Sequence, residues 1–322
     1  MSSSLRAVDL EDRHPSEDDI LADVCAGLRL IPKRLSSRYF YDARGSALFE
    51  QICEQPEYYL TRAELALMRE HVADMAKVVG SEALVVEYGS GSGQKTRLLL
   101  SSLDAPVAYV PVEISRAALT ESVAALAPEF PHIEMLPVCA DFTERIVLPE
   151  PQRRPRRTLV YFPGSTIGNF VTRDAVSLLR EMHEQMGVNG AALIGADLRK
   201  DVAVMEAAYN DAAGVTAEFT SNMLVRFNRE LGADFDVSQF RHHARYNPMA
   251  CRIETQLVSR RAQSVHIHGA QFDFAADEPI LVEYSCKYST DDFSRMAERA
   301  GLQVERVWTD AGQQFALYYL TR

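Results

Sequence analysis

Cysteine is scarce in this chain, and its spacing argues against two kinds of site. The five cysteines among 322 residues are odd in number and scattered, with no C-x-x-C pair. This argues against a disulfide framework and predicts reduced thiols. The histidine pairs, His242-His243 and His266-x-His268, have no cysteine or aspartate ligand set nearby. We therefore expect surface or strand histidines and no bound metal.

Long apolar runs are also missing. No stretch reaches the length that spans a membrane, and the polar N-terminus lacks the apolar core of a signal peptide. We therefore expect a cytoplasmic protein with no membrane partner.

Positive charge is in deficit. Lysine and arginine number 34 against 45 aspartates and glutamates, which gives a net charge of −11. A nucleic-acid backbone would be repelled by such a surface unless a local basic patch intervened. The one basic run, Arg153-Arg154-Pro155-Arg156-Arg157, stands between proline-rich loop residues and a strand. We interpret it as a solvated linker and expect no nucleic-acid partner.

The order of strand and helix patterns predicts the fold class. From about Thr61 to Asp197 the two patterns alternate, as the crossover connections of a parallel sheet require. Strand-like runs occur at 107–112, 133–138, 158–162 and 191–196, with helical runs at 116–126 and 173–186. After Asp197 come helices at 202–210 and 215–231 and strand-like runs at 252–263, 265–274 and 280–285. The tail returns to a helix at 290–300 and strands at 303–309 and 314–320.

We therefore predict an α/β protein with two lobes. A doubly wound, Rossmann-like sheet is expected from residues 63–196 plus 287–322. A second, α+β lobe that binds the substrate is expected from residues 1–62 plus 197–286. A chain of 322 residues is long enough for both, since it buries roughly three quarters of its unfolded surface.

The ten residues from Leu84 to Gly93 are the most informative part of the sequence. An apolar run, typical of a buried strand, ends in an acid and is followed by glycines at every second position. In doubly wound sheets such a loop follows the first strand and binds nucleotide-like ligands, because glycine lets the backbone approach them closely.

Three interpretations compete for this loop. A dinucleotide site needs a small residue where Gln94 or Thr96 stands, and a phosphate loop with Lys95 and Thr96 needs glycine at position 94. The third pattern is E-x-G-x-G-x-G, which runs from Glu87 through Gly89 and Gly91 to Gly93. It resembles the first motif of class I methyltransferases, whose S-adenosylmethionine carries no phosphate and needs close backbone approach instead.

Acidic and aromatic residues at the next strand ends support the third interpretation. Glu113 ends the run at 107–112, where a carboxylate can accept hydrogen bonds from both ribose hydroxyls. Asp141 and Phe142 follow the run at 133–138, and they suit the amino group and the face of an adenine. We therefore assign Gly89, Gly91, Lys95, Glu113, Asp141 and Phe142 to the cofactor site.

Longer blocks carry a more specific resemblance. They are Phe40-Tyr41-Asp42-Ala43-x-Gly45-Ser46-x-Leu48-Phe49, Pro56-Glu57-Tyr58-Tyr59-x-Thr61-Arg62, Pro163-Gly164-Ser165-Thr166-Ile167-Gly168-Asn169, Asp211-Ala212-Ala213-Gly214-Val215-Thr216 and Glu283-x-Ser285-Cys286-Lys287. From about Leu28 to the C-terminus the chain resembles the histidine Nα-methyltransferases of ergothioneine biosynthesis. The resemblance implies trimethylation of the α-amine of L-histidine to hercynine by S-adenosylmethionine, with the amino acid bound between two lobes.

The resemblance also implies a set of substrate residues. Tyr58, Asn169 and Tyr209 would hold the α-carboxylate and α-amine, Gly164 would lie in the same site, and Tyr41 would stand near the amine as the catalytic residue. Glu283 and Ser285, two apart on one strand face, would engage both imidazole nitrogens. Without the resemblance the same residues would be interpreted as strand-face, core-packing and helix-cap positions. Thr255 replaces a family methionine beside the imidazole, and Glu113 replaces a more familiar aspartate.

Other functions stay open on the sequence alone. The substrate could be another amino acid, such as tryptophan. The loop from Gly89 to Thr96 could belong to a nucleotide hydrolase, or the protein could be a sensor that binds an adenosyl ligand without catalysis. We expect a monomer whose partner is a small molecule.

Overall fold

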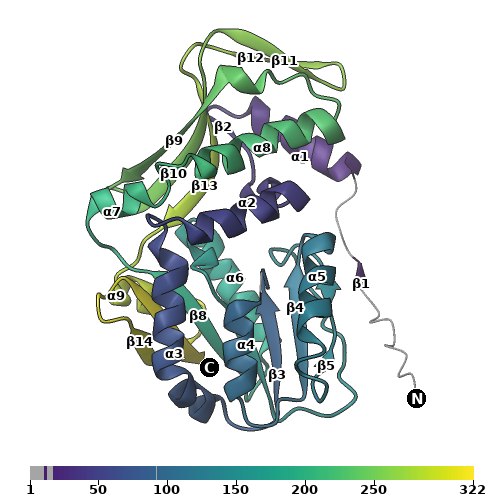
Figure 1. The fold of residues 1–322 in the computed structure, drawn as a ribbon, viewed down its shortest axis with the longest axis vertical. Coiled ribbons are helices and arrows are strands. Elements are labelled where there is room, and N and C mark those ends of the chain that lie inside the picture. Colours follow the sequence, from purple (N-terminus) through teal and green to yellow (C-terminus); the bar gives the residue numbers. More distant parts are fainter. Residues whose placement is uncertain (1–10, 13–16, 92) are drawn as a thin grey trace.

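The largest sheet of the described chain forms the lower lobe of the molecule (Figure 1). The structure is a computed structural model that describes residues 11–12, 17–91 and 93–322. The strands of this sheet are β1 (Glu11–Asp12), β3 (Ala83–Tyr88), β4 (Ala108–Glu113), β5 (Glu134–Met135), β6 (Val138–Cys139), β7 (Arg157–Phe162), β8 (Ala191–Asp197), β14 (Gln303–Thr309) and β15 (Phe315–Thr321). They are ordered β1-β6-β4-β3-β7-β8-β15-β14, with β5 paired to β4.

The strand directions confirm the predicted α/β sheet. β3 lies between β4 and β7 with parallel pairing on both sides, and β7 pairs with β8 in the same sense. β15 is antiparallel to both β8 and β14. The predicted strand at 133–138 is wrong in one respect, because it is divided into β5 and β6. Pro137, which has no N–H to donate to a neighbouring strand, lies at the division.

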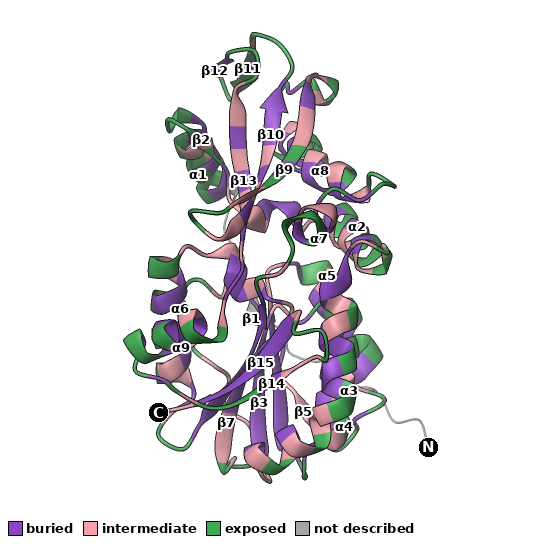
Figure 2. Cartoon of the chain, turned by 90° about the vertical axis from the view of Figure 1, so that its left-hand side faces the viewer, coloured by how far each residue is buried: buried purple, intermediate pink, exposed green. Residues whose placement is uncertain are grey.

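Helices cover both faces of this sheet, as Figure 2 shows. On one side lie α3 (Tyr59–Val79), α4 (Gln94–Ser102) and α5 (Arg116–Leu126), and on the other lie α6 (Thr172–Gln185) and α9 (Thr290–Arg299). Every residue of β3 is buried. Leu84 and Val86 pack in the core that contains α6 and α9, whereas Val85 packs in the core that contains α3 and α4. Alternate side chains thus bury both faces, as a doubly wound sheet requires.

The second lobe is built on a smaller sheet in the order β2-β13-β10-β9. Its strands are β2 (Lys33–Arg34), β9 (Phe240–Asn247), β10 (Arg252–Ser259) and β13 (Pro279–Cys286), with a separate hairpin of β11 (Gln263–Ile267) and β12 (Ala270–Phe274). The helices around it are α1 (Glu17–Arg29), α2 (Ala43–Glu54), α7 (Val202–Ala207) and α8 (Val215–Glu230). Short 3₁₀ helices are η1 (Ser37–Phe40), η2 (Thr166–Asn169) and η3 (Val237–Gln239).

Two strand predictions in this lobe were wrong. The run predicted at 265–274 is a hairpin that turns at His268 and Gly269, both of which have positive φ. β9 was not predicted, because it contains four charged or polar residues, so apolar and polar side chains do not alternate clearly along it. These residues are Arg241, His242, His243 and Arg245. The expectation of surface or strand histidines is confirmed, since His242 and His243 are in β9, His266 is in β11 and His268 is exposed in the turn of the hairpin.

The exact division of the chain between the lobes stays a prediction, but one segment departs from it. β1 pairs with β6 in the larger sheet, although residues 1–62 were expected in the second lobe. Two residues extend a sheet edge by backbone pairing, which leaves no apolar pattern in the sequence.

All five cysteines, which lie in the described ranges, are free thiols. No helix of the described chain is long and apolar enough to cross a membrane.

Candidate functional site

The turn after β3 is open on the side where a ligand would approach. Gly89, Gly91 and Gly93 have φ of +73°, +48° and +72°, a region that strains residues with a side chain. A Cβ built on Gly91 would meet no heavy atom within 4 Å, and one on Gly89 would come 3.9 Å from the Phe142 ring. The turn can therefore accept an adenosyl ligand against its bare backbone.

Glu87 supports this turn from inside the protein. The hydroxyls of Thr96 and Tyr109 donate to its Oε2 at 2.7 and 2.6 Å, and the residue is 1% exposed. Burial raises the pKa of Glu87 to about 7. The first acid of the glycine motif therefore anchors the loop to α4 and β4 and faces away from solvent.

Glu113 lies beside the same turn, as the sequence predicts. Its Oε1 accepts hydrogen bonds from the backbone N–H groups of Ile114 and Ser115 at 2.9 and 3.1 Å. Burial raises its pKa, and a hydrogen bond from the Gly91 backbone acts in the opposite direction. The structure thus brings the glycine turn and the strand-end carboxylate together, in the arrangement that binds a ribose in dinucleotide folds.

Asp141 is held from both lobes. Its Oδ1 accepts from the N–H and hydroxyl of Thr143 at 2.9 and 2.6 Å, and its Oδ2 accepts from Arg38 at 2.9 Å. Phe142 stacks on Tyr88 with ring centroids 5.6 Å apart. Arg38 was not identified from the sequence, because no local pattern connects positions 103 residues apart.

Lys95 forms an ion pair with Glu64, a residue of α3 that is fully buried. The Glu64 carboxylate also accepts the backbone N–H of Gly164 at 2.9 Å. The structure therefore brings two predicted site residues, Lys95 and Gly164, to one carboxylate that sequence reasoning missed. The charge of Lys95 is already matched within the protein, which disfavours the phosphate loop.

Aromatic rings from distant parts of the sequence pack together in the core of the second lobe. Tyr58 lies 6.3 Å from Tyr209 and 6.3 Å from Phe49, and Phe49 lies 5.9 Å from Tyr41, between ring centroids. Burial raises the pKa of all three tyrosines, so their phenols keep their protons. The carboxylates of Glu283 and Glu113 both add to the shift at Tyr41. Tyr41 therefore lies close to the predicted cofactor residue and to the predicted substrate residue.

Tyr209 belongs to a buried polar network. Its hydroxyl lies 2.5 Å from Ser285 Oγ, and Lys287 Nζ donates to both oxygens at 2.9 Å. Lys287 also pairs with Asp197 at 2.6 Å, and both of these charged side chains are fully buried. Two of the predicted substrate residues thus share a cation that the sequence assigned to no role.

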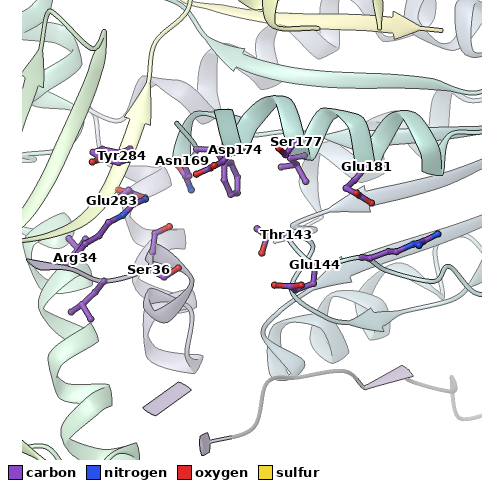
Figure 3. Close-up of a pocket in the computed structure, with 16 residues that line it drawn as sticks. Arg34, Ser36, Thr143, Glu144, Asn169, Asp174, Ser177, Glu181, Glu283 and Tyr284 are labelled. Atoms are coloured by element: carbon purple, nitrogen blue, oxygen red, sulfur yellow. The ribbon is translucent and has the colours of Figure 1, made fainter. Parts of the chain in front are cut away.

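Glu283 and Asn169 line a cavity of about 530 Å³ between the lobes (Figure 3). Glu283 comes from β13 and Asn169 from the end of η2, and Thr143, Glu144 and residues of α6 lie across the opening. Burial raises the pKa of Glu283 to about 7, although the charge of Lys287 opposes the shift. A carboxylate with so elevated a pKa is suited to a ligand that offers a hydrogen bond.

Thr255 lies on β10 directly opposite Glu283 on β13. It is 1% exposed, and within the described ranges its hydroxyl has no hydrogen-bond partner. The position where the family resemblance implies methionine is thus a buried alcohol at the imidazole end of the predicted site.

Comparisons with known proteins agree with this geometry. A family profile described as "Histidine-specific methyltransferase, SAM-dependent" matches residues 20–322. The chain is 40% identical to a histidine N-alpha-methyltransferase of Mycolicibacterium smegmatis, over 93% of this chain and 94% of that one. It is 30% identical to ergothioneine biosynthesis protein 1 of Neurospora crassa, over 90% of this chain and 33% of that one. A solved S-adenosylmethionine-dependent methyltransferase from Clostridium acetobutylicum has a TM-score of 0.49 at 10% identity, covering 85% of this chain and 97% of that one.

Proposed function

Because this chain belongs to the family of S-adenosylmethionine-dependent, histidine-specific methyltransferases, we propose that it methylates the α-amino nitrogen of L-histidine three times. The product is hercynine, the trimethylated betaine. The name of the Neurospora crassa relative supports a place for the reaction in ergothioneine biosynthesis. The region around Tyr41, Tyr58 and Tyr209 is the proposed place of transfer.

The position of Tyr41 is the observation that supports this proposal most directly. Tyr41 is close enough to Glu113 and to Glu283 for both carboxylates to raise its pKa. A ribose held by Glu113 and an imidazole held by Glu283 would then both lie in the neighbourhood of Tyr41. In methyl transfer the donor carbon and the amine must approach to about 3 Å, so positioning of this kind supplies much of the rate.

Binding of the cofactor requires only close approach of the protein backbone and two carboxylate side chains. S-adenosylmethionine, when bound, supplies a methyl group on a positively charged sulfur. Glu113 would hold the ribose, Asp141 the adenine amino group and Phe142 the adenine face, with the Gly89 and Gly91 backbone alongside. The open space at Gly91 and the hydrogen bond from that backbone to Glu113 support the fit.

The substrate side is built to bind and orient, not to remove protons. Tyr58 and Asn169 would donate hydrogen bonds to the α-carboxylate, and Tyr209 would contact the α-amine. The raised pKa values keep these phenols neutral, so none is a strong base. Free α-amines have a pKa near 8, so a usable fraction is already unprotonated. The aromatic faces of Tyr41 and Tyr58 favour the quaternary cation that forms last.

A nucleotide hydrolase is disfavoured as a second function by the partner of Lys95. A phosphate loop needs this lysine free to meet an anion, whereas here it pairs with the buried Glu64. The remaining expectations, of a cytoplasmic monomer without a metal or a nucleic-acid partner, stay predictions.

Competition between amino acids tests the proposal. The purified protein is incubated with S-adenosylmethionine and either L-histidine or L-tryptophan, and products are identified by mass spectrometry. We expect trimethylated histidine, formed roughly tenfold faster or more than any tryptophan product. Comparable rates would contradict the substrate assignment.

Calorimetry separates the methyltransferase from a nucleotide hydrolase. It should detect binding of S-adenosylhomocysteine and none of magnesium ATP, and the reverse result would favour the hydrolase.

A further inference from the structure

Lys287, immediately after β13, is a buried cation that the proposed function does not yet use. It is 1% exposed, and a lysine so deeply buried requires charged or polar partners. Although burial opposes it, the adjacent Asp197 and Tyr209 raise the pKa of Lys287, so the ammonium keeps its charge. Asp197 is fixed in turn by the Tyr59 hydroxyl at 2.7 Å and by Lys200 at 2.5 Å.

The three hydrogens of this ammonium match three acceptors. Nζ lies 2.6 Å from Asp197 Oδ2 and 2.9 Å from both Tyr209 Oη and Ser285 Oγ. An ammonium can only donate, so each hydroxyl oxygen gives one lone pair to Lys287. The protons of Tyr209 and Ser285 must therefore point elsewhere.

The contact between the two hydroxyls decides the direction of the next hydrogen bond. Tyr209 Oη and Ser285 Oγ are 2.5 Å apart, so one donates to the other. A phenol is much more acidic than an alcohol, and a bond from a cation polarises it further, so Tyr209 is the donor. Ser285 Oγ then accepts twice, from Lys287 and from Tyr209, and has no lone pair left.

We propose that Lys287 is a positioning residue that makes Ser285 a hydrogen-bond donor, and not an acceptor, towards the side chain of the amino-acid substrate. This inference rests on the proposed function and specifies its substrate more closely. Ser285 and Glu283 are two apart on β13 and share one face of the strand. They present one donor and one acceptor, which match a neutral imidazole with one bare nitrogen and one N–H. An imidazolium has two N–H groups, and a thiophene has neither group, so both match poorly.

Substrate preference in a double-variant series tests this. The measurement is kcat/KM for L-histidine divided by kcat/KM for 3-(2-thienyl)-L-alanine, whose five-membered ring lacks nitrogen. We expect Lys287→Met and Ser285→Ala each to lower this ratio roughly tenfold, the value of one good hydrogen bond to a buried polar group. The double variant should lower it no further, because Lys287 acts through Ser285. Equal losses for both substrates, or losses that multiply in the double variant, would overturn the proposal.

Lys200→Met is the matched control. Lys200 also pairs with Asp197, but its recorded hydrogen bonds go to Asp197, Tyr59 and Leu198 and not to Tyr209 or Ser285. We expect the substrate ratio to stay unchanged in this variant. S-adenosylhomocysteine affinity and thermal unfolding show whether each variant is folded. Asp197 retains Lys200 and Tyr59 when Lys287 is replaced, which limits the loss of stability.

A measurement on the unaltered protein avoids any effect of mutation on folding. ¹⁵N-labelled L-histidine is bound together with S-adenosylhomocysteine at neutral pH, and its ring nitrogens are observed by NMR. We expect one protonated and one bare nitrogen in a single fixed tautomer. Two protonated nitrogens would overturn the inference while leaving the proposed function intact. If the protein neither binds nor methylates histidine, the proposed function itself fails.

Discussion

Three glutamates show how partners decide the role of one residue type. Glu87 is enclosed and accepts two hydroxyl hydrogen bonds. Glu113 accepts backbone N–H groups at the rim of the glycine turn. Glu283 faces the cleft between the lobes. Burial raises the pKa of all three, but only the last two can meet a ligand.

The raised pKa of Glu87 predicts a pH-dependent stability. The folded protein holds this proton more tightly than the unfolded chain, since the pKa moves from 4.5 to about 7. The wild-type free energy of unfolding should therefore lose this contribution as the pH rises from about 4.5 to about 7. Glu87→Gln cannot ionise, so its stability relative to wild type should rise over that range by at most about 3 kcal/mol. Urea denaturation at pH 5, 6, 7 and 8 measures this, and parallel curves would contradict it.

Replacement of Glu283 tests the imidazole contact. Glu283→Ala leaves no acceptor for the ring N–H, so we expect the KM for L-histidine to rise roughly tenfold or more and the preference over tryptophan to fall. Steady-state kinetics with both amino acids provide the measurement. Glu254→Ala is the control, because Glu254 alternates with Thr255 on β10 and lies on the opposite strand face. An unchanged KM in Glu283→Ala would remove this residue from the site.

At the scale of elements, the proposed cofactor and substrate sites both depend on loops that connect a strand of the large sheet to the following helix. The glycine turn joins β3 to α4, and η2 with its preceding loop joins β7 to α6. Both turns follow parallel strands whose carboxyl ends lie at one edge of the sheet, which is where ligands bind in doubly wound folds. The second lobe adds β13, Tyr209 after the end of α7, and Tyr41 and Tyr58, which precede α2 and α3.

Adding a methyl group to the glycine turn after β3 tests whether this turn contacts the cofactor. Gly91→Ala adds a Cβ into empty space at φ +48°, which should cost about 1 kcal/mol of stability. Gly232→Ala adds one into empty space at φ +58°, after α8 in the second lobe, and should cost about the same. We expect the affinity for S-adenosylhomocysteine, measured by calorimetry, to fall at least roughly tenfold only in Gly91→Ala. Equal affinities would separate the turn from the cofactor site.

At the scale of the whole molecule, the two lobes meet through a charged contact. Arg38, in η1 of the second lobe, donates to Asp141, which follows β6 in the sheet lobe. The carboxylate is 8% exposed and the arginine 28%. This contact would couple the proposed adenine site to the lobe that is proposed to bind the amino acid.

Removal of this ion pair tests the coupling. Arg38→Met should lower the free energy of unfolding by about 1–2 kcal/mol. Arg229→Met, which breaks a more exposed pair with Asp42 inside the second lobe, should lower it by about 1 kcal/mol or less. We expect only Arg38→Met to weaken S-adenosylhomocysteine binding, because Asp141 loses the partner that orients its Oδ2. The comparison requires denaturation and calorimetry on both variants. A similar loss of affinity in both, or in neither, would show that the pair does not connect the lobes to the cofactor.

The sequence by itself determined those features of the protein that depend on residues close together in the chain. The alternation of strands and helices, the glycine turn, the acid at the end of β4 and the family blocks all depend on local spacing, and they predicted the α/β fold and the methyltransferase family. The strand β9 and the division at Pro137 were missed because polar alternation and a single proline give weak local signals.

Only the tertiary structure decided which charges neutralise one another. Lys95 meets Glu64, Asp141 meets Arg38, and Lys287 meets Asp197 and Tyr209 across intervals of 31 to 103 residues. Such pairs form because a buried charge must find a partner wherever the fold brings one near, and no spacing along the chain encodes that meeting. The chemistry of the cleft therefore follows from long-range burial, whereas the class of the protein follows from short-range pattern.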